Sequence, residues 1–158
     1  MSVRLYGDWS KARSIFGSLA SRFQHEIKKA SGIVTEYIDR VVTLHLDRQD
    51  LNWKPLSPEF LKFKRGHGYS TDIYTMTASY RNSIATWVSP DGFSCAVGVK
   101  RTALHAKSKR PLVQLGYVLE YGSEAAGIPA RPLWRPSFDE TKPEILEIYK
   151  KAIMRCFT

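Results

Sequence analysis

The chain has 158 residues, 43% hydrophobic and 12% aromatic, which suits one domain with a substantial core. Its two cysteines, Cys95 and Cys156, are far apart in sequence and form no disulfide framework, so we expect free thiols in a reducing compartment. The start of the chain lacks the apolar run of a signal peptide, and no window approaches the ~18 uninterrupted apolar residues of a membrane span. We therefore expect a protein made in a cytoplasm, without a membrane partner.

The charge of the chain is strongly basic. The formal net charge is +9 and the isoelectric point is about 9.7. Such a charge favours an anionic neighbour, such as DNA, RNA or an acidic protein surface. The lysines and arginines are spread along the sequence, however, so a basic surface that only maintains solubility is an alternative.

A long amphipathic helix is predicted over residues 9–48, with Asp8 or Ser10 as its N-cap. Apolar and small residues recur there in steps of three and four: Ala12, Phe16, Leu19, Phe23, Ile27, Ala30, Val34, Tyr37, Val41 and Leu44. A helix of ~35–40 residues would be ~55 Å long, more than a domain of this size can cover, so part of it should project or pack on another subunit. The alternative is two shorter helices separated near Gly32.

The rest of the chain, residues 51–158, is predicted to be an α+β body in the same single domain. Ser57 and Pro58 mark the start of a short helix, and residues 71–83 suggest another that ends near Asn82. Residues 84–89 and 93–99 are two strands around Pro90-Asp91-Gly92, a hairpin signal. The small face formed by Ala96 and Gly98 suggests that another segment packs closely on that strand.

A basic segment separates the hairpin from the next predicted helix, which runs from Pro111 to Gly122. We expect the segment to be an exposed loop, and its residues are candidates for facing a ring lumen, DNA or an acidic partner: Lys100, Arg101, Lys107, Lys109 and Arg110. The alternative is a solvated connection without a partner.

The stretch from Leu119 to Phe138, here called the proline elbow, organises the second half of the chain. Pro129, Pro132 and Pro136 stiffen it, and a last helix should begin between Ser137 and Pro143. Burying an unpaired guanidinium is costly, so we expect Arg131 to bind a carboxylate, either Glu120 or an acidic residue of an adjacent subunit. The candidate interface residues are Glu120, Arg131, Pro132, Trp134 and Arg135. The alternative is a rigid connection packed on the core.

Catalytic motifs are not found in the sequence. The four histidines are isolated from metal-ligand spacings, and no glycine-rich phosphate loop, nucleophile elbow or carboxylate pair is present. We therefore expect neither an enzyme nor a bound metal or cofactor.

Several short motifs together resemble tailed-phage tail-completion proteins. The likeness is to the Mu-like virion morphogenesis family and to a related family of minor tail or neck components. It covers about residues 52–145, and the pieces that carry it are Trp53-Lys54-Pro55-Leu56-Ser57-Pro58, Thr77 to Ile84, Val97-Gly98, Glu120-Tyr121-Gly122 and Ile128-Pro129-Ala130-Arg131-Pro132-Leu133. The chain departs from the family at Ala78, where glycine is usual, and at Tyr80, where leucine is usual.

The resemblance implies a structural virion protein of the neck, where head meets tail. Such proteins act as rings, often hexamers, that complete or terminate the tail or join it to the head connector. The implied partners are other copies of the chain, head connector or adaptor proteins, and tail tube or terminator proteins, with non-specific DNA contact through phosphates. The rival hypothesis is a basic nucleic-acid-binding protein that acts as a monomer or small oligomer.

Overall fold

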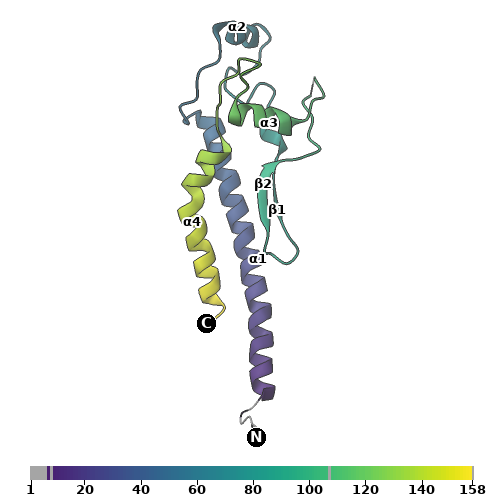
Figure 1. Ribbon diagram of the computed structural model, residues 1–158, viewed down its shortest axis with the longest axis vertical. Coiled ribbons are helices and arrows are strands. Elements are labelled where there is room, and N and C mark those ends of the chain that lie inside the picture. Colours follow the sequence, from purple (N-terminus) through teal and green to yellow (C-terminus); the bar gives the residue numbers. More distant parts are fainter. Residues whose placement is uncertain (1–6, 8, 107, 158) are drawn as a thin grey trace.

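The computed structural model describes Gly7, residues 9–106 and residues 108–157. It confirms the predicted α+β fold, with a long N-terminal helix, one antiparallel hairpin and further helices (Figure 1). In chain order the elements are α1 (Trp9–Arg48), α2 (Pro58–Gly66), a 3-10 turn (Arg81–Ser83), β1 (Ile84–Val88), β2 (Cys95–Val99), α3 (Leu112–Tyr121) and α4 (Trp134–Arg155). Among the described residues, no helix is long and apolar enough to cross a membrane.

Helix α1 is a single helix of 40 residues, so the alternative of two shorter helices is wrong. At 1.5 Å per residue it is about 60 Å long. Gly32 does not interrupt it, because the neighbouring Ala30, Ser31 and Val34 are all buried against the rest of the body. Tertiary packing therefore outweighs the cost of about 1 kcal/mol that glycine adds within a helix.

Helix α4 lies antiparallel to the second half of α1. The Nε2 atom of His45, near the end of α1, lies 3.0 Å from a carboxylate oxygen of Glu140 near the start of α4, while Glu26 lies 3.8 Å from Arg155 at the other end. The other ring nitrogen of His45, Nδ1, lies 2.6 Å from an Asp50 carboxylate oxygen, so both ring nitrogens of this buried histidine are partnered. Because α4 ends opposite Glu26, the first part of α1 projects beyond the body (Figure 1).

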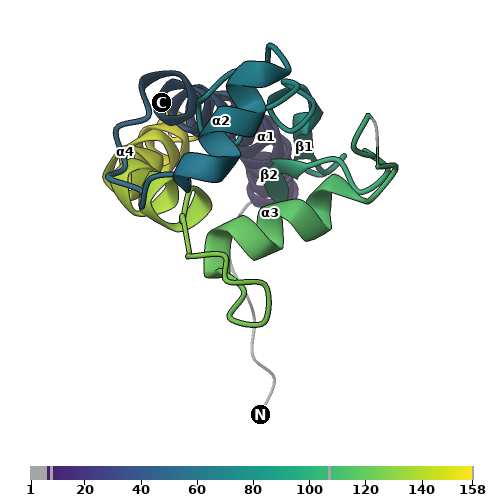
Figure 2. The same cartoon turned by 90° about the horizontal axis from the view of Figure 1, so that it is seen from above.

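The hairpin packs on α1 beside α4 (Figure 2). Its register pairs Ile84 with Val99 and Val88 with Cys95, as expected from the turn signal between the strands. At the turn, Gly92 has φ +82°, and a Cβ there would lie 2.5 Å from the Cα of Lys28. Only glycine allows the turn to lie this close to the helix backbone.

Three local features of the body differ from, or refine, the prediction. Residues 71–83 form turns and a single 3-10 turn instead of a short α-helix, because Tyr74 and Tyr80 are drawn into the core. Ala78 has φ +53°, in the left-handed region that favours glycine, so the chain turns tightly here with alanine. Helix α2 begins as predicted, with the Ser57 hydroxyl accepting from the Phe60 N–H at 3.2 Å.

The main core lies where the C-terminal end of α1 meets the loop before β1, the start of α3 and the start of α4. Its buried members come from all of these segments: Val42, Leu46, Tyr74, Tyr80, Leu112 and Leu133. Segments distant in sequence are thus fixed to one another at the level of the proline elbow.

Candidate functional site

Glu120 fixes the start of helix α4. Its Oε2 accepts hydrogen bonds from the backbone N–H groups of Leu133 (2.7 Å) and Trp134 (3.0 Å), and its Oε1 accepts from that of Arg135 (3.0 Å). A buried carboxylate thus occupies the positive end of the helix dipole and satisfies N–H groups that have no partner within the helix. This capping explains why α4 begins at Trp134, earlier than the predicted start between Ser137 and Pro143.

Arg131 does not pair with Glu120, so that part of our prediction is wrong. The residue is 5% exposed, and its Nε and Nη2 donate to the backbone carbonyls of Lys54 (2.8 Å) and Pro55 (3.0 Å). Both oxygens of Glu120 already accept hydrogen bonds from the start of α4. The carbonyls of residues 51–57, the extended segment before α2 that we call the lead-in, include those within reach of the guanidinium. Burial lowers the pKa of the Arg131 guanidinium.

The proline elbow and the lead-in before α2 are bound together. The Trp53 indole N–H donates to the Pro132 carbonyl at 2.6 Å, and the Tyr74 hydroxyl donates to the Arg131 carbonyl at 2.8 Å. Gly122, with φ +79°, lets the loop fold back, because a Cβ there would lie 2.8 Å from the Ala130 nitrogen. Of the predicted interface residues, Glu120 and Arg131 are therefore internal braces, whereas Pro132 and Arg135 are exposed and Trp134 is half-buried.

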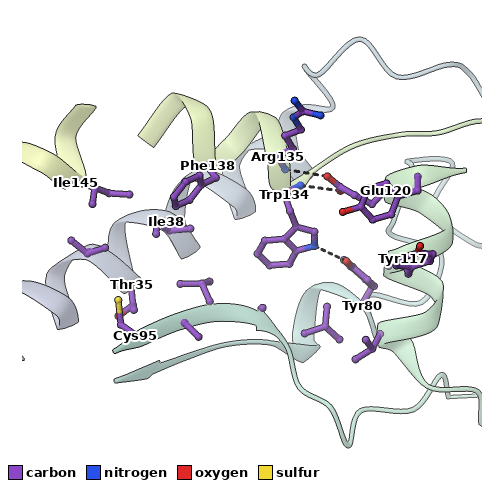
Figure 3. Close-up of a pocket in the computed structure, with 18 of the residues that line it drawn as sticks. Thr35, Ile38, Tyr80, Cys95, Tyr117, Glu120, Trp134, Arg135, Phe138 and Ile145 are labelled. Carbon is purple, nitrogen blue, oxygen red and sulfur yellow. Dashed lines mark hydrogen bonds between the residues drawn. The ribbon is translucent and has the colours of Figure 1, made fainter. Parts of the chain in front are cut away.

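An open groove of about 760 Å³ lies beside Glu120 and the start of α4. Helix α1 forms its floor, β2 one wall, α4 the other wall and α3 one end (Figure 3). Apolar and aromatic side chains dominate the lining: Val34, Ile38, Val97, Val99, Val113, Tyr117, Tyr121, Trp134, Phe138 and Ile145. We call this feature the central groove.

The polar groups at the two ends of the central groove are already partnered. At one end the Trp134 indole N–H donates to the Tyr80 hydroxyl at 3.0 Å (Figure 3). Toward the other, the Tyr149 hydroxyl lies 2.8 Å from the Ser31 hydroxyl and 3.6 Å from the Cys95 sulfur. Burial raises the pKa of the Tyr149 phenol. What the groove offers a partner is therefore mainly apolar surface.

Close packing on the small face of β2 was predicted but is not observed. A Cβ added at Gly98 would meet nothing within 4 Å, because this strand borders the open central groove. Sequence inspection also missed Tyr149 and Ser31, whose contacts join residues 118 positions apart. Tyr149 lies on the apolar stripe of the last helix, whereas Ser31 lies next to the predicted stripe of the first helix and not on it.

The basic segment is an exposed loop, as predicted. Lys100, Arg101, Lys109 and Arg110 are all exposed, and Lys107 lies outside the described residues. A bridge between Leu104 and Pro111 closes the loop. The loop ends at the start of α3, whereas Glu120 lies in the last turn of α3 and the Arg131 backbone N–H donates to the Leu119 carbonyl, so the two predicted sets of site residues lie at opposite ends of this helix.

No group of histidine, cysteine, aspartate and glutamate side chains within the described part of the chain could hold a metal ion. Both cysteines are free thiols, Cys156 being buried and Cys95 half-buried.

Comparison with known proteins gives one informative similarity. The chain is 28% identical over 131 residues to an uncharacterized protein of Methanocaldococcus jannaschii, and the match spans 83% of this chain and 87% of that protein. No family model and no solved structure matches the chain. The relative's name assigns no activity.

Proposed function

We propose that this chain is a structural virion protein of a tailed phage. Several copies, expected to be six, form a ring at the neck that completes or terminates the tail and joins it to the head. The protein is assembled in the host cytoplasm and binds no cofactor. Its partners are the head connector or adaptor and the tail tube or terminator.

The observation that carries this proposal is the projecting part of α1. Phe16 is 70% exposed, Trp9 58% and Ile15 54%, although they belong to a helix in which several later apolar residues, among them Ile27, Val34 and Leu46, are buried. Soluble monomers rarely leave a contiguous apolar surface of this kind uncovered. A subunit whose longest helix extends past its own core is suited to assembly with other subunits.

A second observation supports the resemblance to neck proteins. Three of its sequence pieces, the lead-in from Trp53, Glu120-Tyr121-Gly122 and the segment from Ile128 to Leu133, contact one another through side-chain hydrogen bonds. Motif pieces far apart in sequence thus form one structural unit. A structural unit held together in this way suits a subunit that must keep its conformation within an assembled particle.

The proposal is tested in the phage or provirus that carries the gene. An in-frame deletion should yield DNA-filled heads and separate, incomplete tails, and expression of the protein in trans should restore joined particles. Electron microscopy of particles with a tagged copy should locate the tag at the neck. Normal particles from the deletion strain would contradict the proposal.

The alternative function, non-specific binding of nucleic acid, is favoured by the exposed cations of the basic loop and the net charge of +9. Binding through phosphates weakens steeply as salt is raised. A monomer that binds DNA in this salt-sensitive manner, and is missing from purified particles, would favour this alternative over the ring.

A further inference from the structure

Two apolar surfaces of this chain are uncovered, and they differ in shape. The first is the α1 stub, which we define as residues 9–22. It is convex, presents Trp9, Ile15 and Phe16, and lies beyond the point where α4 ends opposite Glu26 (Figure 1). The second is the central groove, which is concave and rimmed by Tyr117 (66% exposed), Tyr121 (69%) and Phe138 (50%).

The two surfaces match in length. Residues 9–22 rise about 20 Å, and the wall of the groove from Trp134 to Tyr149 rises about 22 Å. The stub is the straight continuation of the same helix that forms the floor of the groove. It can therefore lie along the groove of another copy in the manner of an amphipathic helix in an apolar groove, without bending.

We propose that the α1 stub of one copy docks in the central groove of a second copy. Because stub and groove are different surfaces, the contact is heterologous, and an open assembly keeps one free stub at one end and one free groove at the other until it closes. The closure into a ring rests on the proposed neck function. The pairwise contact rests on the stub and the groove themselves.

The area available is sufficient for a specific contact. Aromatic side chains bury ~150–250 Å² each when fully covered. Covering the exposed parts of Trp9, Phe16, Tyr117, Tyr121 and Phe138 would hide on the order of 500 Å², and the aliphatic neighbours on both surfaces bring the total near ~1,000 Å², the lower limit for a specific interface. A second copy is thus an adequate occupant.

The charges near both surfaces predict how the contact responds to salt. Arg13 is exposed on the stub, and Arg135 is exposed beside the groove, where its side chain points away from the pocket (Figure 3). Both of these charges are positive, and the Glu120 carboxylate in the groove is buried and already accepts three N–H groups, so the mainly apolar contact has little charge attraction for salt to screen. Assembly should therefore persist or strengthen as salt is raised, opposite to the binding of nucleic acid.

Each surface can be blocked separately. Phe16→Asp blocks the stub and leaves the groove intact, whereas Phe138→Asp, or Tyr117→Asp as a second variant, blocks the groove and leaves the stub intact. Leu146→Asp is the matched control, because Leu146 is 63% exposed on α4 but does not line the groove. Circular dichroism and thermal melting confirm that each variant is folded.

Light scattering across a concentration series then decides the outcome. The unaltered chain and Leu146→Asp should form oligomers, and each blocked variant alone should have the 18.0 kDa mass of a monomer. An equimolar mixture of Phe16→Asp and Phe138→Asp should form a dimer and nothing larger, because it contains one intact stub–groove pair.

Three results would overturn the inference. A monomeric unaltered chain at all concentrations would show that the surfaces fit another partner. Loss of assembly in Phe16→Asp alone, with no rescue in the mixture, would show that stubs pair with stubs. Unchanged assembly in both blocked variants would place the contact elsewhere. Oligomers with the predicted rescue but no protein in virions would instead contradict the proposed function and leave the contact standing.

Discussion

Arg131 and Glu120 hold the proline elbow with opposite chemistries. The guanidinium donates to two carbonyls of the lead-in before α2, and the carboxylate accepts three N–H groups at the start of α4. The two charged side chains do not pair with each other. Each side chain binds backbone groups that have no partner within a helix or strand, and leaving such groups unpaired in a buried site is costly.

We therefore expect replacement of Arg131 to act first on the stability of the fold, and on assembly only as a consequence. Arg131→Lys keeps the charge but loses the planar fork, and we expect the free energy of unfolding to fall by about 2–3 kcal/mol. Arg131→Ala should cost more, and Pro132→Ala less than about 1 kcal/mol. Urea unfolding measures all three, and virion complementation shows whether folded variants still complete tails. Equal stability of Arg131→Lys and the unaltered chain would contradict the role of the fork.

Two buried tyrosines should make the fold sensitive to alkali. Burial raises the pKa of Tyr80 from 10.0 to about 12, and burial also raises the pKa of Tyr74. A raised folded-state pKa means that the neutral phenols contribute their full stabilisation below the unfolded-state pKa and lose it as pH rises through the folded-state value. Stability should thus decline between about pH 10 and about pH 12.

Urea unfolding across that range, followed together with phenolate absorbance, tests the tyrosine prediction. Tyr80→Phe should be less stable at neutral pH, because the Trp134 indole N–H loses its acceptor, but should decline less steeply in alkali. If all eight tyrosines ionise near the ordinary pKa while the protein remains folded, the prediction is wrong.

At the scale of elements, α1 is the surface on which α4 and the hairpin are both assembled. The three elements meet at Ser31, whose hydroxyl donates to the Gly92 carbonyl at 2.7 Å and lies 2.8 Å from the Tyr149 hydroxyl. Small residues at this meeting point let the hairpin turn lie against the helix backbone. The position of β2, and hence one wall of the central groove, depends on this approach.

Gly92→Ala should separate the hairpin turn from α1. The added Cβ meets the Lys28 backbone, so overpacking should cost ~1–3 kcal/mol beyond the ~1–2 kcal/mol of left-handed backbone strain. Gly68→Ala is the matched control, since Gly68 has φ +67° but open space around its Cβ position. Thermal unfolding should show Gly92→Ala to be the less stable of the two. Equal losses would show that the turn does not need this close approach.

For the whole molecule, the exposed basic loop adjoins one end of the central groove at Val99 and Val113, but its described lysines and arginines do not line the groove. Changing Lys100, Arg101, Lys107, Lys109 and Arg110 to glutamine removes five positive charges from a loop whose described residues are exposed. We expect an unchanged melting temperature, intact oligomers and fewer infectious particles, because the charges would face DNA or an acidic partner. Normal titres would show that the loop is only a solvated connection.

The sequence by itself determined the elements whose signals are local. The three-and-four stripe defined α1, the Pro90-Asp91-Gly92 turn placed the hairpin, and Gly122 marked the end of α3, because periodicity and backbone conformation depend on neighbouring residues. The same pattern also indicated that α1 was too long to be covered by its own domain, and the exposure of Trp9 and Phe16 agrees.

The tertiary structure alone decided the partners of the charged side chains and the shape of the site. Both candidate partners of Arg131 were carboxylates, yet the guanidinium binds carbonyls 76 and 77 residues away, and Glu120 extends α4 by capping it. The central groove likewise has no signature in the sequence, since its floor, walls and end come from four separate elements. Such features depend on distances between segments far apart in the chain, which local patterns of residues do not specify.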